Sequence, residues 1–183
     1  MVACKTVDDK TDTMLRGKKR RAEGDQTMDD IVLARALHVL SVLHWIGGVA
    51  FVTLVALPLA NARGGGDGLA LFESIEQRFA SQVRWSIPLA GASGLWMTYR
   101  ADLWSRFQDP HFWWMSAMAG LWVVFALMVF VLEPLLHPRF AALGRRDPVA
   151  MLRRMQRVHA VLLGIAAVTI AGAVAGAQGV NFF

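Results

Sequence analysis

The chain is dominated by long apolar segments that carry no charge. Four stretches contain no Asp, Glu, Lys or Arg: residues 36–62, 85–99, 110–132 and 158–183. A bilayer core of about 30 Å needs about 20 helical residues, a length that all but the second stretch exceed. The second lies between Arg84 and Arg100, which can snorkel to opposite interfaces and extend it. We therefore predict an all-α, polytopic membrane protein, a bundle of four transmembrane helices near residues 33–58, 81–103, 112–136 and 156–178.

Two amphipathic segments lead into these helices. Ahead of the second helix, apolar residues recur at three- and four-residue spacing, as in a helix: Phe72, Ile75, Phe79 and Val83. Ahead of the fourth, one face holds Leu152, Met155, His159 and Leu162. Asp147-Pro148 is a typical helix start. Pro88 predicts a kink in the second helix, and the four-residue spacing of Gly172 and Gly176 predicts close helix packing.

Composition supports the membrane interpretation. The chain is 55% hydrophobic and 18% charged, against about 45–50% and about 25% in soluble domains. Its single cysteine, Cys4, excludes a disulfide framework, a redox pair and a Cys-rich zinc site. The net charge is +5, but the basic residues lie at the margins of the apolar runs. This distribution favours a lipid bilayer as the partner and argues against nucleic acid.

The first 27 residues differ in kind from the rest. They hold the only cysteine and all four lysines, whereas residues 28–183 hold twelve arginines and no lysine. They lack the apolar core of a signal peptide. We expect residues 1–27 to be either a disordered leader or a mis-assigned start, with Met28 as the favoured true start, and residues 28–183 to form the transmembrane domain.

Arginines predict the orientation. With four helices, both termini and the loop near residues 104–111 lie on one side, together with Arg35, Arg100 and Arg106. The opposite side carries nine arginines: Arg63, Arg78, Arg84, Arg139, Arg145, Arg146, Arg153, Arg154 and Arg157. Including the leader changes the ratio to ten against nine and removes the signal. Without it, the positive-inside rule puts both termini in the periplasm of a bacterial inner membrane.

The chemistry-bearing residues are histidines in or beside the helices: His38, His44, His111, His137 and His159. An intramembrane imidazole costs free energy unless it has a partner, so it indicates either a ligand site or hydrogen bonds between helices. Six residues turn a helix by about 600°, so His38 and His44 point about 120° apart and cannot hold one ion together. By depth, His38 and His111 lie near the outer ends, His159 and His137 near the cytoplasmic ends, and His44 between them.

Thioethers and one acid add weaker candidates. Met97, Met115 and Met118 gather in the outer region, where sulfur with imidazole suits copper and a His/Met pair suits haem. Methionine is also ordinary bilayer filler. Glu133 can pair with Arg157 or His159, or transfer protons, and we favour a structural salt bridge. Among motifs of other enzyme classes, GxSxG, P-loop, HExxH and a dinucleotide-binding GxGxxG are absent.

The run ALHVLSVLHWIGG, which begins at Ala36, resembles the first helix of the copper-resistance protein D family, with its ALH followed by W-x-GG. HemJ-type protoporphyrinogen oxidases are similar in this helix and in the amphipathic lead into the second. Unlike them, the chain has FVTLVALP from Phe51 in place of a Tyr-Leu-Pro-Arg-like stretch, and its body has no lysine. The resemblance maps His38, Trp45, Gly47 and Gly48, and it implies that His38 is a haem or metal ligand.

Three functions compete. The first is a haem-dependent oxidoreductase, in which b-type haem passes electrons to a quinone or another redox partner. Gly47 and Gly48 beside His44 would then let a flat macrocycle approach the helix. The second is copper uptake or resistance at an outer His/Met site, and the third is an accessory or structural subunit without cofactor, with homo-oligomers allowed. We rank His38 first as ligand and His44 second, with His159 or His111 in supporting roles.

Overall fold

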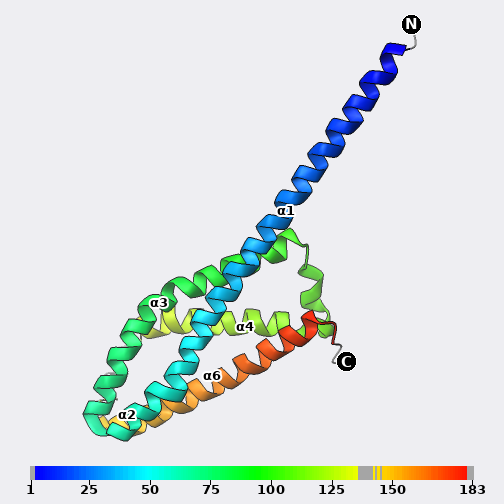
Figure 1. Cartoon of the computed structure of the whole chain (residues 1–183). Coiled ribbons are helices and arrows are strands. Elements are labelled where there is room, and N and C mark those ends of the chain that lie inside the picture. Colours follow the sequence, from blue (N-terminus) through cyan, green and yellow to red (C-terminus); the bar gives the residue numbers. More distant parts are fainter. Residues whose placement is uncertain (1–2, 136–141, 143, 145, 181–183) are drawn as a thin grey trace.

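The computed structural model describes residues 3–135, 142, 144 and 146–180, and every element in this part of the chain is helical (Figure 1). The prediction of an all-α protein is therefore confirmed for these residues. In chain order the elements are α1 (Ala3–Phe51), the π-helix η1 (Val52–Ala56), α2 (Leu57–Arg63), α3 (Gly65–Arg100), the 3₁₀-helices η2 (Trp104–Gln108) and η3 (Pro110–Phe112), α4 (Trp113–Leu127), the π-helix η4 (Met128–Leu132) and α6 (Pro148–Ala177).

The helices form an up-down-up-down bundle. After α2 the chain reverses at Gly64, whose φ of 69° suits glycine, and α3 returns along α1. Pairs of contacting residues show that the two helices are antiparallel: His38 meets Ala90, and His44 meets Gln82. We call the end with Arg100, η2, η3 and Ala177 the Arg100 end, and the opposite one the Gly64 end. From the bundle, the first half of α1 extends outward at the Arg100 end (Figure 1).

Among the described residues, three helical segments are long and apolar enough to cross a membrane: Met28–Arg63, Pro110–Leu135 and Pro148–Ala177. Only 6% of the apolar window of the second is buried inside the chain. Large apolar side chains on their outer faces are exposed, such as Leu54 (68%) and Val168 (63%). Such surfaces suit contact with lipid better than contact with water.

The second predicted span, residues 81–103, does not meet the same standard of length and hydropathy. Its helix, α3, is long enough, but its uncharged part is only the 15 residues from Trp85 to Tyr99, and these include serines and glycines. α3 also carries Glu73, Glu76 and Arg78 near the Gly64 end. Three spans are thus supported, and the fourth stays a prediction.

Several local predictions are confirmed. α6 begins at Pro148, and the Asp147 carboxylate caps it by accepting a hydrogen bond from the backbone N–H of Ala150 at 2.9 Å. The amphipathic lead into the second helix is part of α3, which curves along its length (Figure 1); α3 contains Pro88, and a kink at that residue stays a prediction. Gly172 and Gly176 do allow close packing, in this case against the rings of Trp113 and Trp114.

Two apolar clusters hold the bundle together. The first joins all four long helices at mid-height: Trp45, Ile46, Val49, Val83, Ile87, Phe125 and Ala166. The second closes the Gly64 end without α4: Val52, Leu57, Ala60, Leu69, Phe72, Met151 and Leu152. Toward the Arg100 end, the buried residues are mostly small or polar, including Ser41, Ser93, Thr98 and Thr169. Such residues are common where membrane helices pack closely, and Ser93, Thr98 and Thr169 each donate to a carbonyl of their own helix.

Both π-helical segments end two residues before a proline. η1 is followed by Pro58 and η4 by Pro134. A proline has no N–H to give to the carbonyl four residues back, and its ring crowds that carbonyl. Widening the preceding turn relieves the crowding, so the two prolines explain the local change of helix type.

Residues 3–27 belong to α1 as a helix that projects beyond the bundle, whereas the sequence favours a leader outside the domain. The boundary at residue 28 therefore stays a prediction.

Candidate functional site

His38 lies on the buried stripe of α1, together with Ser41 and Trp45. Its Nδ1 is 2.8 Å from the carbonyl oxygen of Ala90 on α3. A carbonyl can only accept, so Nδ1 is the donor, and in the neutral tautomer that this bond selects the lone pair is on Nε2. An imidazole held in this way is the usual arrangement of a haem or metal ligand, in which the second nitrogen is anchored to the protein.

Two residues of α3 shape the place of this imidazole. The Ser93 hydroxyl lies 3.4 Å from Nδ1 and donates to the Leu89 carbonyl at 2.6 Å. A Cβ at Gly94 would come within 3.1 Å of the His38 ring. A side chain at position 94 would therefore push the ring away, which gives that glycine a steric role.

Met118 of α4 is the natural counterpart of His38. The rings of Trp45 and Phe125 meet edge to face at 4.8 Å, which fixes the relative height of α1 and α4. Both helices run toward the Gly64 end, and two turns back from this pair lie His38 and Met118, each seven residues earlier. Seven residues return to nearly the same helix face, so Met118 is half-buried on the side of α4 that carries Phe125, and His38 is half-buried on the side of α1 that carries Trp45.

His44 is in a different environment. It is exposed, and its Nε2 lies 3.2 Å from the amide oxygen of Gln82. The space at Gly48, one turn after His44, is occupied, because a Cβ at this position would overlap the ring of Phe79. The expectation that Gly48 leaves room for a macrocycle is therefore wrong: the space is filled by Phe79 from α3. Gly47 has open space around its Cβ position.

His159 lies beside the part of α3 that is near the Gly64 end. Its Nδ1 donates to the Met155 carbonyl one turn earlier at 2.9 Å, and its ring stands edge-on to Phe72 at 6.5 Å. The predicted orientation into the bundle is confirmed, since the side chain is half-buried beside the Gly64-end cluster.

The three intramembrane histidines are separated by height along α3. His38 lies at Ala90, His44 at Gln82 and His159 at Phe72. With a rise of about 1.5 Å per residue, neighbouring levels differ by about 12 to 15 Å. The three imidazoles therefore lie at separate levels of the bundle.

The weaker candidates fall in two groups. His111 is exposed in η3 and binds Asp109 through Nδ1 at 2.8 Å, which lowers the pKa of that carboxyl through hydrogen bonds from the His111 backbone N–H and ring. Met97 and Met115 are half-buried toward the Arg100 end, Met97 one turn beyond Ser93 on α3. His137 lies outside the described residues. The described part of the chain holds no group of three or more His, Cys, Asp or Glu side chains placed to bind a metal ion.

Glu133 forms the predicted salt bridge, but with a different partner. Its carboxylate lies 3.5 Å from Arg84 of α3, instead of pairing with Arg157 or His159. The negative charge of Glu133 also affects the pKa of Glu76, a half-buried residue that the sequence analysis does not identify. Burial first, then the charges of Glu133 and Glu73, raises the pKa of Glu76 to about 7.

No protein-family model, curated protein or solved structure matches this chain.

Proposed function

We propose that the protein is a multi-pass membrane protein that binds b-type haem through His38 and passes electrons. The proposal extends the supported membrane character to four spans, counting α3, with both termini in the periplasm of a bacterial inner membrane and with kinship to the copper-resistance protein D and HemJ-type families. The observation that carries it is the His38 imidazole, anchored through Nδ1 to the Ala90 carbonyl, so that Nε2 is the nitrogen not engaged in this bond.

The proposed ligands are one histidine and one thioether, because the three described histidines of the long helices lie at separate levels of the bundle. His38 would offer nitrogen, and Met118, two turns before Phe125 on α4, would offer sulfur. Side chains of facing helices are the usual source of cofactor ligands in bundle cores. When bound, the haem would supply one-electron redox chemistry. Ser93 and Gly94 would hold and accommodate the imidazole, and the apolar cluster at Trp45 would keep water out from the Gly64 side.

Copper handling is the second candidate, because three thioethers lie on the same half of the bundle as His38. Met97 on α3 and Met115 and Met118 on α4 lie toward the Arg100 end, where His38 is also found. Sulfur and imidazole together suit copper. An accessory subunit without cofactor is the outcome if neither group binds.

The test is the absorption spectrum and metal content of the full chain, purified in mild detergent with haem supplied during expression. We expect a haem spectrum in the wild type that is lost in His38→Ala and weakened or shifted in Met118→Leu. His44→Ala and His159→Ala are matched controls that should keep it. Copper in place of haem, lost in His38→Ala, would select the second candidate. Full occupancy in His38→Ala, or neither group in the wild type, would refute the assignment.

A further inference from the structure

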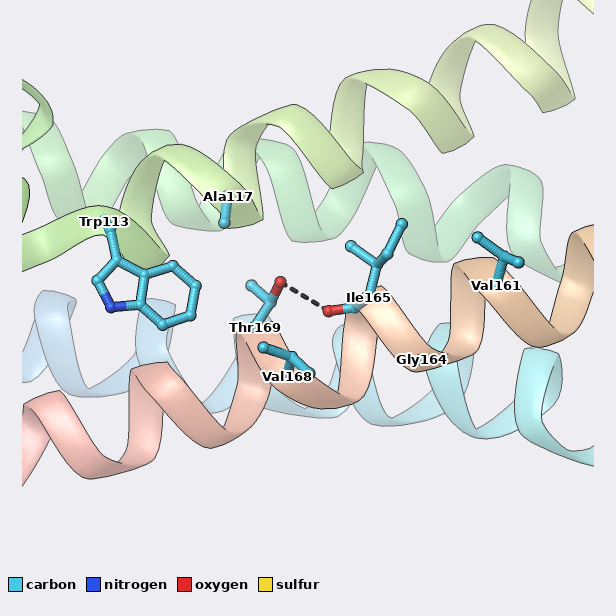
Figure 2. Close-up of a pocket in the computed structure, with 7 residues that line it drawn as sticks. All are labelled: Trp113, Ala117, Val161, Gly164, Ile165, Val168 and Thr169. Atoms are coloured by element: carbon cyan, nitrogen blue, oxygen red, sulfur yellow. Dashed lines mark hydrogen bonds between the residues drawn. The ribbon is translucent and has the colours of Figure 1, made fainter. Parts of the chain in front are cut away.

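An apolar groove of about 390 Å³ lies on the outer surface of the bundle, along the seam of α4 and α6 (Figure 2). Its lining comes from Trp113 and Ala117 of α4 and from one face of α6 between Val161 and Thr169. The one hydroxyl of this lining, that of Thr169, donates to the Ile165 carbonyl at 2.8 Å. The groove therefore offers no free donor and suits a hydrocarbon chain.

The two ends of the groove differ in charge. At one end the Trp113 ring projects from α4 toward α6, and at the other end lies Val161 (Figure 2). Arg157 stands one turn before Val161 on α6, and Arg154 stands about one turn earlier still, both with exposed side chains. The part of α6 beyond Arg157 is uncharged and has about the 20 residues that cross a bilayer core. The two arginines therefore lie at the boundary between hydrocarbon and headgroups.

Both arginines continue the face of α6 that lines the groove. A helix turns by about 100° per residue, which places Arg154 about 20° to one side of Val161 and Arg157 about 40° to the other. The lining residues cover a wider arc around Val161, from about 60° at Gly164 on one side to about 80° at Thr169 on the other. The arginines lie within this arc, so the apolar groove leads to two positive charges.

These two charges are not balanced by acidic side chains. Among the described residues, no carboxylate forms an ion pair with Arg154 or Arg157. Glu133, which follows η4 at the same end of the bundle, has Arg84 of α3 as its partner at 3.5 Å. Because Arg154 and Arg157 are three residues apart on one helix face, their charges repel each other. A phosphate bound between them removes this repulsion, and its oxygens suit the planar guanidinium groups.

The dimensions match one leaflet of lipid. The lined face of α6 from Val161 to Thr169 extends about 12 Å and begins about 6 Å beyond Arg157, at a rise of about 1.5 Å per residue. Half of a bilayer core is about 15 Å thick. An acyl chain whose phosphate lies at the arginines therefore reaches along most of the groove. A second copy of the chain in the same orientation fits less well, since it would bring its own arginines to the same level.

We propose that the seam of α4 and α6 binds an anionic phospholipid of the bilayer, with one acyl chain in the groove and its phosphate between Arg154 and Arg157. The proposal goes beyond the proposed function and does not rest on it, because the site includes neither His38 nor Met118. It requires only that α4 and α6 cross the membrane, for which both are long and apolar enough.

The test measures the affinity of the full chain in detergent for its first bound lipid, by native mass spectrometry. The probes are dioleoylphosphatidylglycerol, which is anionic, and dioleoylphosphatidylcholine, which has the same chains and no net charge. We expect the wild type to bind the anionic lipid about five- to thirtyfold more tightly, as one to two arginine–phosphate contacts at a membrane surface predict. The double variant Arg154→Gln, Arg157→Gln should lose this preference. The double variant Arg63→Gln, Arg78→Gln, which removes two exposed arginines outside α6, should keep it and controls for net charge.

Gly164→Leu tests the groove, because a Cβ at Gly164 meets open space and the larger side chain fills the hollow without a clash. It should weaken the binding of both lipids, while Gly47→Leu, at an open position on α1, should leave both unchanged. His38→Ala should bind both lipids as the wild type does, so failure of the haem proposal and failure of this one are distinguishable.

Equal affinities of the wild type for the two lipids would overturn the proposal. A preference that survives Arg154→Gln, Arg157→Gln, or that falls equally in the control Arg63→Gln, Arg78→Gln, would also overturn it. Unchanged binding in Gly164→Leu would refute the position of the acyl chain, and wild-type dimers that this substitution dissociates would assign the groove to a second copy.

Discussion

Replacing Glu76 by glutamine should stabilise the protein at pH 8 and have little effect at pH 4.5. The pKa of this half-buried carboxyl is raised from 4.5 to about 7, by burial first and then by the charges of Glu133 and Glu73. A shift of that size corresponds to about 3 kcal/mol of preference for the neutral form. Glutamine has nearly the same shape and never ionises, so it keeps the packing and removes the cost of the charge.

The sign follows from linkage. Because the pKa of Glu76 is higher in the folded than in the unfolded protein, its ionisation opposes folding. The stability of the wild type is complete below pH 4.5, falls as the pH rises from 4.5 to about 7, and has lost the full amount above that. The gain from Glu76→Gln should therefore grow from near zero to about 3 kcal/mol across this window.

The assay is unfolding by SDS in mixed micelles at pH 5, 6, 7 and 8, with wild type and Glu76→Gln side by side. Glu73→Gln is the matched control, since this exposed carboxylate lies one turn earlier and has the smallest influence on Glu76. It should give a gain well below that of Glu76→Gln. A difference between Glu76→Gln and wild type that does not change from pH 5 to pH 8 would show that the carboxyl is not buried against Glu133.

Three further outcomes are expected. Gly48→Leu should destabilise the bundle by about 1–3 kcal/mol, because the new side chain collides with Phe79. Gly47→Leu, whose side chain meets open space, should be tolerated, and thermal melts in detergent compare the two variants. Asp147→Ala should cost about 1 kcal/mol by removing the cap of α6, with Asp147→Asn restoring most of it in the same melts. A reporter enzyme fused after Phe183 should be active in the periplasm, and activity in the cytoplasm instead would reverse the topology.

Features that depend on neighbouring residues were predictable from the sequence. The Asp147-Pro148 start of α6 and the amphipathic first turns of α3 were both expected. Each rests on capping or on a periodicity of three to four residues, which a few consecutive side chains determine. The placement of His38 on a buried stripe with Ser41 and Trp45 follows from the same periodicity.

Features that depend on distant helices were not predictable. Nothing local shows that Phe79 occupies the space at Gly48, or that Glu133 chooses Arg84 over Arg157, because these contacts depend on the relative height of α1, α3 and α4. The burial of Glu76 was not predictable for the same reason: on its helix Glu76 lies beside charged neighbours, and the Glu133 carboxylate that also acts on its pKa comes from the segment after η4. The Trp45 N–H has no hydrogen-bond partner among the described residues, and this could not be predicted, because it depends on all the helices that pack around the ring.

The π-helical turns ahead of Pro58 and Pro134 have a consequence for how this chain can vary in length. A π turn holds one residue more than an α turn, so it behaves as a one-residue insertion absorbed by the helix. Elsewhere in α1, loss of one residue rotates everything beyond it by about 100° and takes either His38 or Leu57 off its buried face. Within Val52–Ala56 the surplus residue can be removed with the least disturbance, and the same holds for Met128–Leu132. Natural variants that differ by single-residue deletions should therefore gather at these two turns, leaving the spacing between His38 and Trp45 intact.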